Sequence, residues 1–136
     1  MAGTATETLS VVVEREIPAP PAKLWRALTT PQLIEQWLMK NDFEPVVEHR
    51  FTLSADWGKV DCRVEAVEPN KRLSYSWAVY GLDSMVTWTL TSKGAATHLR
   101  LEQSGFRPDQ QRFYDGAKAG LPQFLAKLEQ VVARNG

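Results

Sequence analysis

The sequence contains a single cysteine, Cys62, among its 136 residues. One thiol cannot form an intramolecular disulfide, and it cannot supply the several thiolates of a structural zinc site. Cys62 lies in an alternating segment with apolar neighbours, which is typical of an inert core thiol. The first ten residues, MAGTATETLS, have no apolar signal core. Together these features predict a cytoplasmic protein.

Neither sign of charge is in excess, because 16 Lys and Arg balance 16 Asp and Glu. Nucleic-acid-binding proteins usually carry a basic excess that displaces counterions from phosphate. We therefore expect no nucleic-acid partner. Long hydrophobic runs are also missing, since no window approaches the ~18 apolar residues that cross a bilayer. We expect no membrane span.

Histidine is scarce, with only 2 in the chain, His49 and His98. No HExxH motif or Asp/His cluster is present, so we predict no metal site and no cofactor. Ser104 stands outside a GxSxG motif, and no base–nucleophile pair is visible, which disfavours an enzyme. His98 alternates opposite to Leu99 and is predicted to be exposed. His49 shares the parity of Phe51 and would face inward near a strand end.

Two short amphipathic helices are predicted in the stretch LWRALTTPQLIEQW, residues 24–37. Apolar residues recur there at helical spacing, and Thr30-Pro31 supplies a cap followed by a first-turn proline. Helices this short are not stable alone, so packing must hold them. Trp37 either packs against the edge of a sheet or closes the mouth of a cavity as part of a lid.

The remaining residues before position 107 alternate between apolar and polar, which predicts strands joined by short turns. The segments are 8–17, 49–55, 59–69, 72–79, 85–91 and 97–106. Such a series forms an antiparallel meander with one apolar face that needs a cover. The cover must be a final helix of about 24 residues, capped by Asp109 and kinked but not ended by Pro122. Its predicted apolar stripe is Phe113, Ala117, Leu121, Phe124, Leu128 and Val131.

Several motifs occur together in a recognisable order. They are LWRALTTPQLIEQW, DFEP at 42–45, RFT at 50–52, VEPNKRLSYSW at 67–77, VTWTL at 86–90 and SGF at 104–106. Spread over residues 9–132, they resemble the START-like proteins of the SRPBCC superfamily. Within it, they resemble the bacterial group named after the activator of the heat-shock chaperone ATPase.

The resemblance implies an α+β helix-grip fold. In it, a six-stranded curved antiparallel sheet wraps around a long C-terminal helix, and two short helices lie between strands 1 and 2. It also implies a single START-like domain over residues 1–136, with a structured core at 7–133, while residues 1–6 are expected to fray.

For function, the resemblance implies binding of lipids, polyketides or other apolar ligands, whereas the eukaryotic namesake stimulates a chaperone's ATPase. The sequence departs from relatives at three points. Gln103 stands where relatives often have histidine, which removes a titratable group. Leu121 stands where they often have tryptophan, and Glu48 where they often have glycine.

We predict a ligand cavity between the sheet and the long helix. Its predicted ligand-binding residues are Trp37, His49, Phe51, Tyr75, Trp77, Trp88, Gln103, Leu121 and Phe124. The aromatic members fit a packed core as well as a cavity wall. Tyr75 and Gln103 favour a cavity, because a buried hydroxyl or amide needs a partner that a ligand or water can supply.

The first functional hypothesis is a non-catalytic carrier or sensor of a small hydrophobic or amphipathic molecule. The second is a chaperone-associated interaction module with a role in the stress response. The third is a cyclase- or aromatase-like enzyme.

Overall fold

The computed structural model describes residues 9–134. The predicted fraying at residues 1–6, and residues 7 and 8 of the predicted core and first strand, lie outside that range. The elements in chain order are β1 (Leu9–Ile17), α2 (Pro21–Thr29), α3 (Pro31–Trp37), β2 (Lys40–Asn41), β3 (Arg50–Ala55), β4 (Gly58–Glu68), β5 (Arg72–Val79), β6 (Leu82–Lys93), β7 (Ala96–Phe106) and α4 (Gln111–Arg134).

The sheet has seven antiparallel strands in the order β1-β7-β6-β5-β4-β3-β2. The prediction of six strands is therefore wrong by one. The additional strand, β2, consists of two residues that pair with β3 through Lys40–Ser54 and Asn41–Leu53. Two residues are too few to show alternation, so the sequence pattern could not reveal it. At the other edge, β1 pairs with β7 along its whole length.

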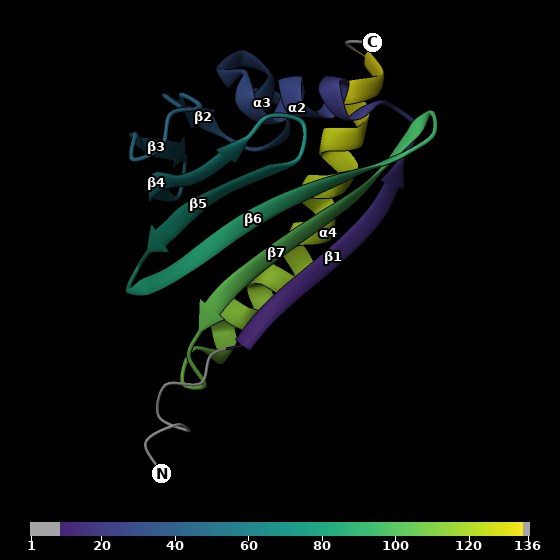
Figure 1. The fold of residues 1–136 in the computed structure, drawn as a ribbon. Coiled ribbons are helices and arrows are strands. Elements are labelled where there is room, and N and C mark those ends of the chain that lie inside the picture. Colours follow the sequence, from purple (N-terminus) through teal and green to yellow (C-terminus); the bar gives the residue numbers. More distant parts are fainter. Residues whose placement is uncertain (1–8, 135–136) are drawn as a thin grey trace.

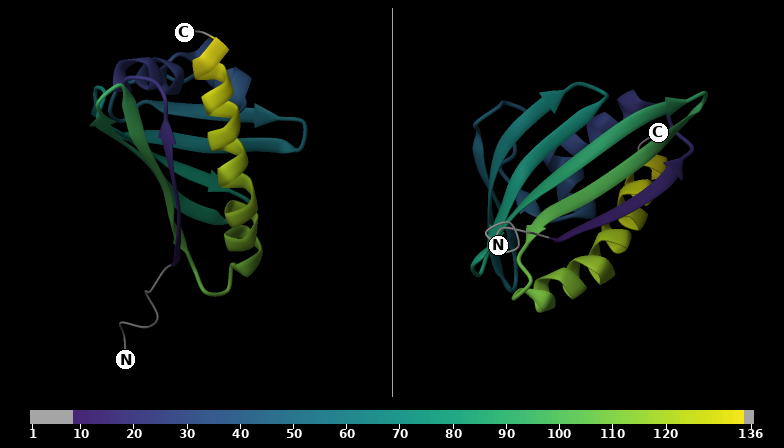
Figure 2. Two further views of the ribbon diagram at one scale, coloured as in Figure 1. Left: turned by 90° about the vertical axis from the view of Figure 1, so that its right-hand side faces the viewer. Right: turned by 60° about the horizontal axis from the view of Figure 1, so that its bottom comes forward.

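The curved sheet wraps around α4, which lies across its concave face (Figure 1). Helices α2 and α3 close one end, beside the C-terminal part of α4 (Figures 1 and 2). Helix α4 continues through Pro122, as the uninterrupted apolar stripe predicts. Its predicted cap is wrong, because the helix begins at Gln111 and the Asp109 carboxylate instead accepts a hydrogen bond from Arg107 Nε at 3.2 Å.

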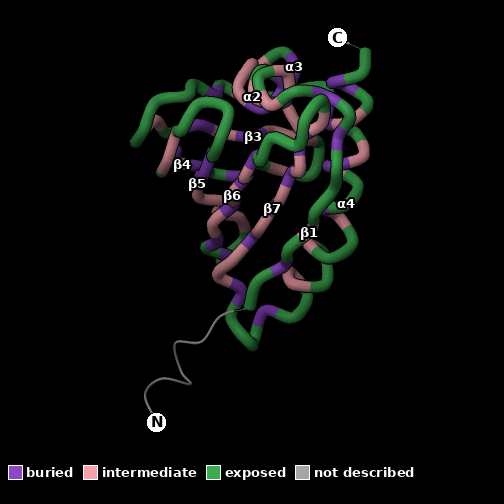
Figure 3. The backbone as a smooth tube through the Cα atoms, turned by 45° about the vertical axis from the view of Figure 1, so that its right-hand side comes forward, coloured by how far each residue is buried: buried purple, intermediate pink, exposed green. Residues whose placement is uncertain are grey.

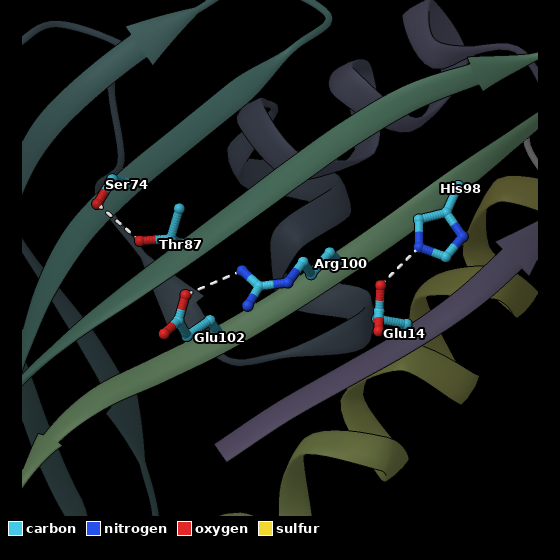
Figure 4. A network of polar contacts seen from close by, with 6 residues as sticks. All are labelled: Glu14, Ser74, Thr87, His98, Arg100 and Glu102. Atoms are coloured by element: carbon cyan, nitrogen blue, oxygen red, sulfur yellow. Dashed lines mark hydrogen bonds and ion pairs between the residues drawn. The ribbon is translucent and has the colours of Figure 1, made fainter. Parts of the chain in front are cut away.

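Burial alternates along the strands, which assigns the two faces of the sheet (Figure 3). On β7, the residues that face α4 are Leu99, Leu101 and Gln103, and all are buried. Polar side chains occupy the opposite face (Figure 4). There His98 meets Glu14 at 2.8 Å and Arg100 meets Glu102 at 2.9 Å. The concave face therefore carries the aromatic surface.

Cys62 is buried on β4, where it pairs across the ladder with Phe51. Burial raises the pKa of its thiol to about 12 from an ordinary value of 9.0, and the carboxylates of Asp61 and Asp42 add to the shift. The thiolate is the reactive species, and with a pKa of about 12 in place of 9.0 it is about 1,000-fold rarer at pH 8.

We therefore expect native protein to react with a disulfide reagent such as DTNB at least about 1,000-fold more slowly than urea-unfolded protein at pH 8. The unfolded sample serves as the control for reagent quality. Comparable rates in the two states would contradict the burial of Cys62.

Candidate functional site

The floor of the candidate site is one row of residues across three strands. Tyr75 on β5 pairs with Val86 on β6, and Val86 pairs with Gln103 on β7. Paired residues point to the same face, and neighbouring strands lie about 4.8 Å apart. Tyr75 and Gln103 therefore lie about 10 Å apart with a small valine between them. The floor is apolar at its centre and polar on either side.

Helix α4 forms the roof, and an open groove of about 240 Å³ lies between roof and floor. Its lining is Trp77, Gln103, Arg112, Phe113, Gly116, Ala117, Gly120, Leu121 and Phe124. Gly116 and Gly120 lie one helical turn apart. A Cβ atom at either position would meet nothing within 4 Å. These two glycines leave open space along the groove.

A second, inner cavity of about 10 Å³ adjoins the groove. Its lining is Trp37, Leu38, Tyr75, Trp77, Val86, Trp88, Leu101, Gln103, Leu121 and Phe124. That volume holds about one water molecule. The two spaces share Trp77, Gln103, Leu121 and Phe124, so these side chains form the boundary between them.

The carboxamide of Gln103 has one oxygen free to accept a hydrogen bond. Ser84 Oγ donates its only proton to the carbonyl of Trp77 at 2.8 Å, so it must accept from Gln103 Nε2 at 2.9 Å. This fixes the amide with its Oε1 turned away from Ser84. No donor among the described residues reaches that oxygen. Every fully buried side-chain polar atom in residues 9–134 has a hydrogen-bond partner. The unpartnered Oε1 must therefore be accessible, and it faces the cavity that Gln103 lines.

Tyr75 supplies the complementary donor. Its hydroxyl accepts a hydrogen bond from Trp88 Nε1 at 3.1 Å, and its own proton has no acceptor within the described part of the chain. Burial raises the pKa of Tyr75 well above its usual value, partly offset by the bond from Trp88. The hydroxyl therefore stays protonated at neutral pH. The cavity thus offers one free acceptor and one free donor.

Trp37 lies at the inner end of the cavity rather than at its mouth. The side chain is 2% exposed, and its Nε1 donates to the carbonyl of Ala27 at 2.9 Å. Its ring meets Trp88 edge-on, with 5.4 Å between ring centroids. These contacts fix Trp37 as the link between α2, α3 and the sheet, which leaves it no role as a lid.

Two of the predicted site residues lie away from both spaces. Phe51 is buried behind Tyr75, with ring centroids 5.4 Å apart. His49 is half-buried and its Nε2 meets the carbonyl of Asp42 at 2.9 Å. Phe51 thus supports the floor from behind, while His49 belongs to the β2–β3 loop region.

Sequence reasoning missed the part of the groove formed by the first half of α4. Arg112, Gly116 and Gly120 recur at steps of four, which places them on one line of the helix. Gly is rare inside helices because it costs about 1 kcal/mol relative to Ala. Two such residues at this spacing are the signal that could have shown where the helix leaves space.

Larger hollows lie on the surface, including one of about 640 Å³ beside Pro20, Pro21 and the adjoining ends of β5 and β6. Another of about 480 Å³ lies beside the end of α3. Both are open depressions, and neither is lined by Gln103 or Tyr75. Size therefore does not distinguish a ligand site among these spaces, whereas the space beneath α4 differs from the others in the free polar atom of its lining.

Two further findings limit the chemistry of the described chain. Within residues 9–134, no three His, Cys, Asp or Glu side chains gather as a metal site would require. No helix in the same range is long and apolar enough to cross a membrane. The arrangement beneath α4 is suited to holding a molecule by apolar contact and by one or two hydrogen bonds.

The sequence model of the family described as "Activator of Hsp90 ATPase homolog 1-like protein" matches residues 18–133. The chain belongs to this family. The strand order, the two short helices and the gripped α4 are thus the family's helix-grip architecture in a bacterial-type member, as the motifs predict. A comparison with proteins of curated function gives no significant match.

Solved structures agree with membership of the Hsp90-activator-like family. Protein MLL2253 from Mesorhizobium loti is 61% identical, with a TM-score of 0.91 over 94% of this chain and 99% of that one. DynU16, from the dynemicin biosynthetic locus, is 27% identical with a TM-score of 0.83, and the match covers 91% of this chain but only 47% of DynU16. The Aha1 dimer from Colwellia psychrerythraea shares the fold at 20% identity, with a TM-score of 0.82 over 91% of this chain and 96% of that one.

Proposed function

We propose that this member of the Hsp90-activator-like family binds a small apolar or amphipathic molecule in the groove beneath α4, as a non-catalytic carrier or sensor. The observation that carries the proposal is the Oε1 atom of Gln103, which belongs to a side chain 5% exposed and has no donor within residues 9–134. A ligand hydroxyl or amine can donate to this oxygen, and such a hydrogen bond contributes about 0.5–1.5 kcal/mol net.

The lining of the groove supplies the remaining affinity. Burial of apolar surface contributes about 25 cal/mol per Å², so about 200 Å² of covered ligand contributes about 5 kcal/mol. A groove of about 240 Å³ suits a molecule of one or two fused rings. A larger ligand requires Trp77 and Phe124, both half-buried, to move so that groove and inner cavity join.

The probe that tests this proposal is 2-naphthol, which has two apolar rings and one hydroxyl. Titration into wild-type protein should give saturable quenching of tryptophan fluorescence and a concentration-dependent rise in melting temperature. Gly120→Leu should abolish both effects, because leucine fills the groove. The same substitution should raise stability by about 1 kcal/mol, since leucine is a better helix former than glycine.

Ala119→Leu is the matched control, because Ala119 is an exposed residue of α4 that does not line the groove. It should bind 2-naphthol as the wild type does. Gln103→Leu should bind 2-naphthol no more tightly than naphthalene, because the acceptor for the hydroxyl is gone. If Gly120→Leu binds 2-naphthol as tightly as Ala119→Leu, the groove is not the site.

The second candidate function is a chaperone-associated interaction module. The family description favours it, and so does an exposed aromatic pair at two hairpin tips. Trp57 is 53% exposed, Tyr80 is 70% exposed, and their rings lie 6.2 Å apart. If this function is correct, a chaperone should co-purify with the protein. The wild-type protein should then change the ATPase rate of that chaperone, and the Trp57→Ala variant should change it less. The carrier function requires no such partner.

A further inference from the structure

We infer that the groove takes an elongated anionic ligand, an apolar carboxylate with a hydroxyl at its far end, and that Arg112 binds the carboxylate. This inference rests on the proposed function, because it assigns the chemical class of the molecule bound beneath α4. Three features of the groove support it: an unpaired guanidinium at one end, a helix N-terminus without acidic residues in its first turn beside it, and the free oxygen of Gln103 toward the other end.

Arg112 is exposed at the rim of the groove and, within residues 9–134, has no carboxylate within 4.0 Å. The acidic side chains nearest in sequence are engaged elsewhere. Asp109 pairs with Arg107 at 3.2 Å, and Asp115 accepts a hydrogen bond from Gln111 at 2.9 Å. The Arg112 guanidinium therefore retains its full set of donors. Its planar fork matches a carboxylate in two parallel hydrogen bonds.

The backbone at this end of the groove also favours a negatively charged ligand. Arg112 is the second residue of α4, a helix of 24 residues with no acidic side chain in its first turn. The N-terminus of a helix carries a partial positive charge and unpaired N–H groups. A ligand carboxylate beside Arg112 would lie close to that charge as well.

The other end of the groove presents neutral polar atoms. From Arg112 to Phe124 the lining spans twelve residues of α4, which corresponds to about 18 Å. Gln103 Oε1 lies on the floor toward the inner cavity, where the Tyr75 hydroxyl has its unused proton. A ligand hydroxyl in the groove can donate to Gln103 Oε1, whereas the Tyr75 hydroxyl lines only the inner cavity. The groove is thus polar at both ends, charged at only one, and apolar between them.

The probe for the inference is 6-hydroxy-2-naphthoate, which adds a carboxylate to 2-naphthol on the side away from the hydroxyl. Its methyl ester is the neutral comparison. Wild-type protein should bind the acid about tenfold more tightly than the ester, as expected for charge-assisted hydrogen bonds to an exposed arginine at the rim of the groove. Added NaCl should reduce the difference, because salt screens exposed charges.

Arg112→Gln should lower the affinity for the acid to about that for the ester, so that the tenfold preference is lost. Arg26→Gln is the matched control, because it removes the same charge at a different place. Arg26 is an exposed arginine on α2 and does not line the groove. This variant should keep the tenfold preference.

The outcomes separate the two proposals. If the wild type binds 2-naphthol and the ester but shows no preference for the acid, the assignment of an anionic ligand is wrong and the groove remains the site. A preference that survives Arg112→Gln, or that disappears in Arg26→Gln, equally overturns the role of Arg112. If none of the naphthalene probes binds the wild type, both the proposed function and this inference fail.

Discussion

Trp37→Ala should lower the free energy of unfolding by about 4 kcal/mol, which corresponds to a fall in melting temperature of about 15 °C for a domain of this size. The side chain is 2% exposed and donates a hydrogen bond to Ala27. Alanine removes the apolar burial, leaves a cavity beside Trp88, and leaves the Ala27 carbonyl without its partner. Urea titration followed by far-UV circular dichroism measures the change.

Trp57→Ala is the control, because it deletes the same side chain at a position 53% exposed. Its cost should stay below about 1 kcal/mol. The bond from the Tyr80 hydroxyl goes to the Trp57 backbone carbonyl, at 2.8 Å, and is kept in this variant. Equal losses for the two variants would mean that α2 and α3 are not held to the sheet through Trp37.

Gly105→Ala should destabilise the protein by about 3 kcal/mol, the second large effect that we expect. Gly105 lies near the end of β7 with a φ of +105°, a conformation that side chains rarely adopt. An added Cβ would lie 2.9 Å from the carbonyl oxygen of Asp83 and 3.2 Å from Ser84 Cα. Both are backbone atoms of β6 and cannot move aside without disturbing the ladder.

Gly94→Ala separates conformational strain from steric overlap. Gly94 also has a positive φ, of 66°, but its Cβ would meet nothing within 4 Å. It should cost only about 1 kcal/mol. If equilibrium unfolding in urea shows the same loss for both variants, the close approach of β6 to Gly105 has no energetic consequence.

The Gly105 variant should also affect the candidate site. Ser84, which the added methyl group would push, is the residue that accepts the hydrogen bond from Gln103. A shift there changes the direction of the Gln103 carboxamide. Selectivity between 2-naphthol and naphthalene should therefore fall in Gly105→Ala in whatever fraction remains folded.

Much of the fold could be predicted because its signals are periodic and local. Alternation along β5 to β7 places Tyr75, Trp88 and Gln103 on one face, and the structure finds all three buried there. The predicted stripe on α4 is only partly right, because it includes Phe113 and Phe124, which are half-buried, and omits Leu125, which is buried in the core. The apolar face of a helix is broad enough that a stripe drawn through Phe124 and one drawn through Leu125 both satisfy the helical spacing.

The details of the site could not be predicted, because they depend on distant partners. The free oxygen of Gln103 exists only because the Ser84 proton goes to the carbonyl of Trp77. The division between groove and inner cavity depends on how large side chains pack, and dense packing makes that division sensitive to small shifts. Local periodicity contains neither kind of information.

The pairing of β1 with β7 has a consequence for the order in which the chain folds. The register joins Val12 to Glu102 and Arg15 to Leu99, and Arg15 also meets Glu129 on α4 at 3.0 Å. Strands β2 to β6 must all be synthesised before β1 meets its partner β7. Contacts so distant in sequence slow folding, because a long loop must close before they form. Until β7 emerges from the ribosome, β1 is therefore an unpaired, valine-rich strand, and Glu14, Arg15 and Glu16 give it the charges that disfavour edge-to-edge association.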